Sequence, residues 1–269
     1  MHRRRPGYRP DRGGTGVIDL TGLHVVVTGG SRGIGAASCR AFAKAGATVL
    51  VHYRERHEEA ERVLDELYAI SSREHRRFPC DVTEPSEIQE LFQFVGSEWG
   101  KLDCLVNNAG VWWHNPLSAF DEVRYIETMR INVRGPFLSV RAALPYLRMS
   151  KQASIINVTS TAAQRGEAFY SPYAASKGAL VSATKAWASE LAPEIRVNSV
   201  APGWVDTEMS ARALREDPAV REEIEAQIPL RRVATAEDIA APIVFLASPL
   251  ARHITGEILN VNGGSVLCG

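Results

Sequence analysis

Short apolar runs alternate with longer stretches of helical periodicity from Leu20 to the end of the chain. The first run, His24–Thr28, is apolar at nearly every position, which is typical of a parallel strand covered on both faces. In His57–Ile70 apolar residues recur at positions i, i+3, i+4 and i+7, as expected of a helix that packs one face on a sheet. This alternation predicts a parallel sheet with crossover helices.

The same patterns place seven strands and at least six helices along the chain. The predicted strands are His24–Thr28, Thr48–Tyr53, Arg77–Cys80, Leu102–Val106, Ser154–Val158, Arg196–Val200 and Ile258–Val261. The predicted helices are Gly33–Ala45, His57–Ile70, Glu84–Trp99, Glu122–Val133, Pro136–Arg148, Pro172–Leu191 and Ala236–Leu246. No linker rich in Gly, Pro or Ser separates them, so we expect one doubly wound α/β domain over residues 20–269.

Residues 1–19 do not share this pattern. The segment carries several arginines among Gly and Pro, but no apolar core of a signal peptide and no amphipathic period. These features favour a disordered basic tail over a secretory or transit peptide.

Charge and cysteine content narrow the function classes. The chain has 31 basic and 31 acidic side chains, so it lacks the basic excess expected of a nucleic-acid binder. No apolar run approaches the ~20 residues that span a bilayer, so we expect no membrane segment. The four cysteines, Cys39, Cys80, Cys104 and Cys268, show no metal-ligand spacing. We therefore expect buried thiols, no metal site and a reducing, cytoplasmic location.

A glycine-rich turn follows the first strand and opens a helix. It reads Thr28-Gly29-Gly30-Ser31-Arg32-Gly33-Ile34-Gly35. Glycines permit a tight turn and a close approach of backbone to ligand, and a helix N-terminus presents N–H groups to a pyrophosphate. The strand, turn and helix context predicts a dinucleotide site.

The spacing of Gly29, Gly33 and Gly35 resembles that of the short-chain dehydrogenase/reductase family. Further motifs of this family recur in order: Asp81-Val82, Asn107-Asn108-Ala109-Gly110, Asn132, Ser160, Tyr173, Lys177 and Pro202-Gly203. The resemblance is to the 3-oxoacyl-ACP reductase and glucose dehydrogenase branch. It implies a Rossmann-like seven-stranded sheet in the order 3-2-1-4-5-6-7 with helices on both faces. It also implies an NAD(P)(H)-dependent oxidoreductase that interconverts a ketone or aldehyde and an alcohol.

Tyr173 and Lys177 are four residues apart in a predicted helix, so both side chains leave from one face. A nearby ammonium stabilises a phenolate, and we expect Lys177 to lower the pKa of Tyr173. Ser160 lies at the end of a predicted strand, where open α/β sheets bind ligands. The resemblance implies that Tyr173 is the acid or base and that Ser160 hydrogen-bonds the substrate oxygen. It also implies that Lys177 holds the nicotinamide ribose and that Asn132 supports a water relay at a helix distortion.

Cofactor preference depends on the end of the second strand, His52-Tyr53-Arg54. A carboxylate there favours NAD, whereas an arginine can bind a 2′-phosphate. Arg54 and Arg32 therefore favour NADP(H), while the adjacent Glu55 leaves NAD(H) open. The expected cofactor-binding residues are Gly29, Ser31, Arg32, Gly33, Ile34, Gly35, Arg54, Asp81, Val82, Asn108, Ala109, Gly110, Tyr173, Lys177, Pro202, Gly203, Val205 and Thr207.

Two segments are expected to cover a small-molecule carbonyl or alcohol substrate. Trp112, His114, Phe169 and Trp204 are the candidates for lining the pocket, although tryptophans near loops also serve surface packing or subunit contacts. The charged segment Trp204–Leu230 predicts a mobile lid. Thioester, sugar and other ketone substrates stay open, as does a non-catalytic nucleotide-binding sensor or scaffold. By resemblance we expect a homo-oligomer, a tetramer or a dimer.

Overall fold

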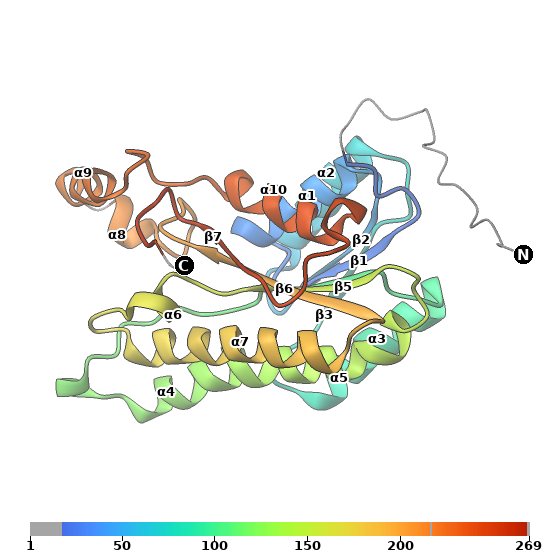
Figure 1. Cartoon of the computed structure of the whole chain (residues 1–269), viewed down its shortest axis with the longest axis horizontal. Coiled ribbons are helices and arrows are strands. Elements are labelled where there is room, and N and C mark those ends of the chain that lie inside the picture. Colours follow the sequence, from blue (N-terminus) through green and yellow to red (C-terminus); the bar gives the residue numbers. More distant parts are fainter. Residues whose placement is uncertain (1–17, 216, 268–269) are drawn as a thin grey trace, which may run out of the picture.

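Seven parallel strands form the centre of the protein (Figure 1). The structure is a computed structural model and describes residues 18–215 and 217–267. The strands are β1 (His24–Val27), β2 (Thr48–Tyr53), β3 (Arg76–Pro79), β4 (Cys104–Asn107), β5 (Ala153–Val158), β6 (Ile195–Pro202) and β7 (Ile258–Val261). Their order, β3-β2-β1-β4-β5-β6-β7, confirms the expected Rossmann-like sheet.

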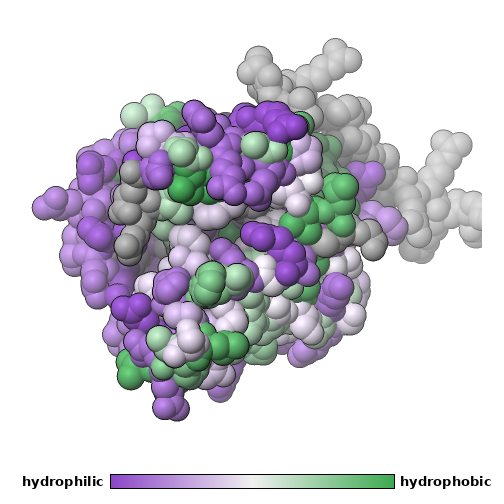
Figure 2. Space-filling model, turned by 90° about the vertical axis from the view of Figure 1, so that its left-hand side faces the viewer, coloured by the Kyte–Doolittle hydropathy of each residue, from purple (hydrophilic) through white to green (hydrophobic). Residues whose placement is uncertain are grey.

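Helices cover both faces of this sheet (Figure 1). One layer contains α1 (Gly33–Lys44), α2 (His57–Ile70) and α10 (Ala236–Ala247). The other contains α3 (Pro85–Trp99), α4 (Glu122–Met129), α5 (Gly135–Leu147) and α7 (Ser171–Glu190). Because every strand is parallel, all their carboxyl ends meet at one edge, beside α6 (Ala162–Arg165) and α8 (Ala211–Arg215). Figure 2 looks onto this face of the molecule.

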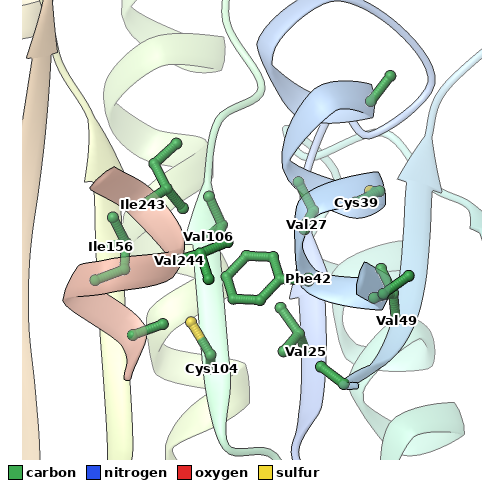
Figure 3. Close-up of a cluster of buried hydrophobic side chains, with 14 of the residues drawn as sticks. Val25, Val27, Cys39, Phe42, Val49, Cys104, Val106, Ile156, Ile243 and Val244 are labelled. Atoms are coloured by element: carbon green, nitrogen blue, oxygen red, sulfur yellow. The ribbon is translucent and has the colours of Figure 1, made fainter. Parts of the chain in front are cut away.

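The core lies in two apolar layers, one on each face of the sheet. In the first, Phe42 of α1 packs among Val25, Val27 and Val106 of the sheet and Ile243 of α10 (Figure 3). These side chains are fully buried. Burial of a side chain of this size contributes about 1.5–3 kcal/mol, so the layer fixes α1, and with it the glycine-rich turn, on the sheet.

Two predicted elements differ from the structure. The helix expected over Glu122–Val133 ends as α4 at Met129, and a π-helix over Arg130–Arg134 joins it to α5. The segment after β6, which is expected to be a mobile lid, contains α8 and α9 (Pro218–Gln227), two helices that the sequence pattern did not place. Asp206 accepts hydrogen bonds from Arg215 (2.8 Å) and Arg221 (3.1 Å), which ties both helices to the segment that follows β6.

Three further expectations concern the N-terminal tail and the cysteines, a membrane segment and a metal site. Residues 1–17 of the expected tail and Cys268 lie outside the described residues, and Cys39, Cys80 and Cys104 are buried free thiols. No described helix combines the length and apolar character that crossing a membrane requires. Within residues 18–215 and 217–267, His, Cys, Asp and Glu side chains form no group of three or more that is arranged to hold a metal ion.

Candidate active site

Two adjoining pockets occupy the hollowed face at the carboxyl ends of the strands (Figure 2). One, which we call the dinucleotide pocket, runs from the glycine-rich turn to the ends of β2 and β3. The other, the substrate pocket, holds Ser160, Tyr173 and Lys177. Ile34, Asn108 and Thr207 line both, so the two pockets form one crevice.

The glycine-rich turn is held in place by His52 on β2. The Gly29 N–H donates to Nδ1 of His52 (3.0 Å), and the Gly30 N–H donates to the His52 carbonyl (2.7 Å). Nε2 of the same ring lies 2.9 Å from the Cys80 carbonyl, so the imidazole is neutral with its proton on Nε2. Burial lowers the pKa of His52 to about 4, which keeps Nδ1 an acceptor at neutral pH.

The turn leaves room and N–H groups for an anion. A Cβ on Gly35 would lie 2.1 Å from the Gly29 carbonyl oxygen, so only glycine lets α1 start this close to the turn. The N-terminus of α1 carries no side-chain cap at Arg32 and no acidic residue in its first turn. Its N–H groups therefore point into the dinucleotide pocket without a side-chain acceptor, which suits a pyrophosphate.

The far end of the dinucleotide pocket mixes charges of both signs. Arg54 pairs with Glu55 (3.0 Å) and with Asp81 (3.6 Å), and Arg32 pairs with Glu208 (2.7 Å) across the crevice. Apart from Asp81, the side chains in these ion pairs are largely exposed. Each ion pair is therefore weak, and a bound phosphate can replace it. Both guanidinium groups are thus available to an incoming phosphate.

The structure places all but one of the expected cofactor residues on the two pocket walls. The dinucleotide pocket is lined by Gly29, Ser31, Arg32, Gly33, Ile34, Arg54, Asp81, Val82, Asn108, Ala109, Gly110 and Thr207. The substrate pocket is lined by Tyr173, Lys177, Pro202, Gly203, Val205 and Thr207. Gly35 is not among the lining residues and acts through the close approach of α1 to the turn.

Ser160, Tyr173 and Lys177 meet in the substrate pocket. Ser160 follows β5, and its side chain hydrogen-bonds with that of Tyr173 on α7. Lys177 is buried one turn further along α7, with Nζ 5.8 Å from the centre of the tyrosine ring. Its ammonium donates to the Val158 carbonyl (2.8 Å) at the end of β5. The end of one strand and one helix therefore place the three side chains in the same pocket.

The pKa values correct one expectation. Burial raises the pKa of Tyr173 to about 12, the hydrogen bond from Ser160 lowers it, and the charge of Glu167 raises it. Burial also lowers the pKa of Lys177 to about 8. Lys177 was expected to depress the tyrosine pKa, but desolvation is the largest influence on this pKa, and the Lys177 ammonium donates to the Val158 carbonyl. Tyr173 is consequently a neutral phenol at pH 7, a proton donor.

Asn132 lies in the π-helix and is fully buried. Its Oδ1 accepts from the Val111 N–H (2.8 Å), and its Nδ2 donates to the Val111 carbonyl (2.9 Å) and to Ser176 (3.0 Å). The amide thus joins the segment after β4 to the helix that carries Tyr173.

Of the four expected substrate residues, two line the substrate pocket and two lie beside it. Trp112 and Trp204 form part of the wall. His114 and Phe169 are not among the lining residues that the structure describes, and their rings contact each other 5.9 Å apart. Phe169 is 63% exposed, so this pair packs on the outside of the wall rather than within it.

Sequence reasoning missed two residues of this site. His52 lies in an ordinary-looking strand, and its bond to Gly29 spans 23 residues, so only the pairing of β1 with β2 shows it. Glu167 lines the substrate pocket, where burial raises its pKa and a hydrogen bond from Trp112 lowers it again in part. Glu167 lies in a short loop of mixed composition, which gave no signal that this residue lines the pocket.

The chain is similar to known oxidoreductases along most of its length. A family model described as enoyl-(acyl carrier protein) reductase matches residues 29–265. The 3-oxoacyl-[acyl-carrier-protein] reductase FabG of Staphylococcus epidermidis is 35% identical over 240 residues, 89% of this chain and 97% of the relative. FabG of Thermotoga maritima is 33% identical over 249 residues, 92% of this chain and 99% of the relative.

The fold has close counterparts among solved structures. A short-chain dehydrogenase/reductase of the glucose/ribitol dehydrogenase type from Brucella melitensis superposes with a TM-score of 0.88 at 32% identity. The superposition covers 93% of this chain and 99% of that one. The shared sheet, the glycine-rich turn and these matches together show that the chain is an oxidoreductase of the short-chain dehydrogenase/reductase family, similar to the 3-oxoacyl-ACP reductases.

Proposed function

We propose that this chain interconverts a ketone or aldehyde and the corresponding alcohol with NADP(H), and that Tyr173 is the acid or base. One observation carries the proposal: Ser160, Tyr173 and Lys177 line one pocket, and this pocket continues into the glycine-rich turn. The neutral phenol favours carbonyl reduction, because this direction needs a proton donor.

Each residue has a distinct task in the proposed reaction. The bound cofactor supplies a hydride to the carbonyl carbon. Tyr173 donates its proton to the carbonyl oxygen, and Ser160 donates a hydrogen bond to the same oxygen as negative charge develops there. Such a preorganised donor contributes about 3 kcal/mol in comparable sites. Lys177 lines the substrate pocket, and its Nζ lies near Gly110, which lines both pockets. There it is proposed to bind the nicotinamide ribose.

The finer features of this function are also proposals. NADP(H) is preferred because Arg32 and Arg54 flank the end of the dinucleotide pocket, although Glu55 competes for Arg54. A 3-oxoacyl thioester is one substrate class, suggested by the names of the relatives. We further propose a cytoplasmic enzyme that assembles as a dimer or a tetramer.

Replacement of the catalytic hydroxyl tests the mechanism. We expect Tyr173→Phe to keep the dissociation constant for NADPH while kcat falls at least ~100-fold, the low end for acid–base residues. NADPH oxidation is followed with a panel of ketones, aldehydes and acetoacetyl thioesters. Tyr125→Phe, which removes a hydroxyl from a surface-exposed ring on α4, is the matched control. Near-normal turnover by Tyr173→Phe would refute the assignment.

The same assay addresses a non-catalytic role. A sensor or scaffold protein would bind NADPH tightly and turn over no member of the panel. No observation in the crevice favours this alternative, since the three side chains proposed for proton transfer converge in it.

A further inference from the structure

One wall of the substrate pocket is made of aromatic rings that pack against one another. Trp112 stacks on Tyr170 with ring centres 4.4 Å apart and planes 12° apart, and it makes a T-shaped contact with Trp204 at 5.8 Å between ring centres. Trp112 and Trp204 both line the pocket. A wall of indole rings fixed by their neighbours favours a flat apolar or aromatic body, because such a ligand loses little freedom against it.

One carboxylate faces this wall. Glu167 lies between α6 and α7, lines the same pocket, and accepts a hydrogen bond from the Trp112 side chain. A carboxylate has about four acceptor sites, so a single donor leaves most of them unused. Its charge reaches the reacting group, since it raises the pKa of Tyr173.

The backbone keeps Glu167 at the pocket. Phe169, two residues further on, adopts a left-handed conformation with φ of 67°, which is rare for an aromatic residue. Its carbonyl accepts the Asn115 N–H (2.8 Å), so the segment that carries Glu167 is tied to the loop after β4. Strain of this kind persists where surrounding contacts enforce it, often at ligand sites.

Two cationic side chains line the same pocket as Glu167. Arg165 lines the pocket but is exposed at its mouth, and among the described residues it acts on Glu167 only through space. Water screens an exposed charge more than a partly buried one. Lys177 is directed at the Val158 carbonyl, on the side of the pocket that joins the dinucleotide site. Of these three charges, the Glu167 carboxylate is the one that contacts the aromatic wall, through Trp112.

We propose that Glu167 makes this pocket selective for carbonyl compounds with an aromatic or flat apolar body and a cationic nitrogen. The nitrogen pairs with the Glu167 carboxylate, and the indole faces of Trp112 and Trp204 stabilise the positive charge further. An anionic substituent in the same place is rejected. This inference rests on the proposed function and names the substrate class for that site.

Three ketones of nearly equal shape test the proposal. They are 4-acetyl-N,N-dimethylbenzylamine, which is cationic at neutral pH, the neutral 4-isobutylacetophenone and the anionic 4-acetylphenylacetate. We expect kcat/KM with NADPH to follow the order cation, neutral, anion, with a preference for the cation over the neutral ketone of about tenfold. In Glu167→Gln this ratio falls to about one, mainly through KM for the cation. Because the readout is a ratio, a general loss of activity cancels.

Matched variants separate charge from structure. Glu167→Asp keeps the charge and retains the order of the three ketones. Arg165→Gln, which removes the neighbouring cation, raises the preference for the cationic ketone. An unchanged ratio in Glu167→Gln, or a wild-type preference for the anionic ketone that Arg165→Gln abolishes, would overturn the proposal.

Binding of the same ketones to the NADP⁺-loaded protein, measured by calorimetry, gives the ranking without turnover. If the ranking holds but no carbonyl compound is reduced, the proposed function fails and the selectivity stands. If ketones are reduced but the ranking is absent or reversed, the selectivity fails alone.

Discussion

At the scale of single residues, His52 determines the geometry of the glycine-rich turn. Its ring accepts from Gly29 and lies against the Cys80 carbonyl, so it joins β1, β2 and β3 at the point where the dinucleotide pocket begins. Only the neutral ring can accept the Gly29 N–H, because both nitrogens of a protonated histidine are donors. Acid is therefore expected to disrupt this turn.

The sign of the pH effect follows from the lowered pKa of His52. At pH values between about 4 and 6.5 the unfolded chain binds a proton at this residue and the folded chain does not. The free energy of unfolding consequently decreases as pH falls through this window, by about 3 kcal/mol in total, and above the window it does not change with pH through His52. We expect urea denaturation at pH 7.5 and pH 4.5 to show a smaller acid loss for His52→Leu than for the wild type.

His24 and His75 also have lowered pKa values and are present in both proteins, so the difference between them isolates His52. Equal losses of stability in the two proteins would contradict the assignment.

Arg54 tests cofactor preference at the same scale. A 2′-phosphate offers Arg54 a stronger partner than its exposed pair with Glu55, so we expect Arg54→Ala to lose at least ~10-fold in kcat/KM with NADPH and little with NADH. Steady-state kinetics with both cofactors measure the change. Glu55→Gln is the matched control, expected to improve use of NADPH. An unchanged NADPH preference in Arg54→Ala would remove this residue from the site.

At the scale of elements, the strands were predictable because a parallel strand is apolar on both faces and leaves a continuous run. The strand β5, for example, was expected to start at Ser154 and starts at Ala153. Periodicity alone did not show where α4 ends, although the family resemblance implied a helix distortion at Asn132, which is where the π-helix lies. The amide of Asn132 bonds there to Val111 and Ser176, up to 44 residues away. The helices after β6 were missed for a similar reason, since Asp206 holds them through ion pairs that a pattern of charges does not reveal.

The candidate site also has features that the sequence predicts and features that only the folded structure shows. Tyr173, Lys177 and Ser160 were predictable from spacing and family resemblance, because one helical turn and one strand end set their positions. The direction of the shift in the Tyr173 pKa was not predictable. It depends on burial and on the charge of Glu167, which are properties of the assembled pocket.

At the scale of the whole molecule, one face carries apolar side chains that residues 18–215 and 217–267 leave exposed. Val123 and Ile126 of α4 and Phe137 of α5 are 72%, 47% and 47% exposed. On α7, Ala175 and Gly178 are not buried against the sheet, so small residues open this helix to a neighbour. Apolar surface of this kind typically marks an interface. A second copy of the chain, related by a twofold axis, would cover the same residues on both partners.

We therefore expect light scattering after size exclusion to give a mass that is a multiple of the chain's own. In Val123→Glu combined with Phe137→Glu, carboxylates placed opposite each other across the twofold axis repel and are desolvated, so the mass falls toward that of the monomer. Val220→Glu adds a charge at an exposed apolar position of α9, away from this face, and is expected to leave the mass unchanged. A monomeric wild type at micromolar concentration, or a double variant with unaltered mass, would show that α4 and α5 do not form the interface.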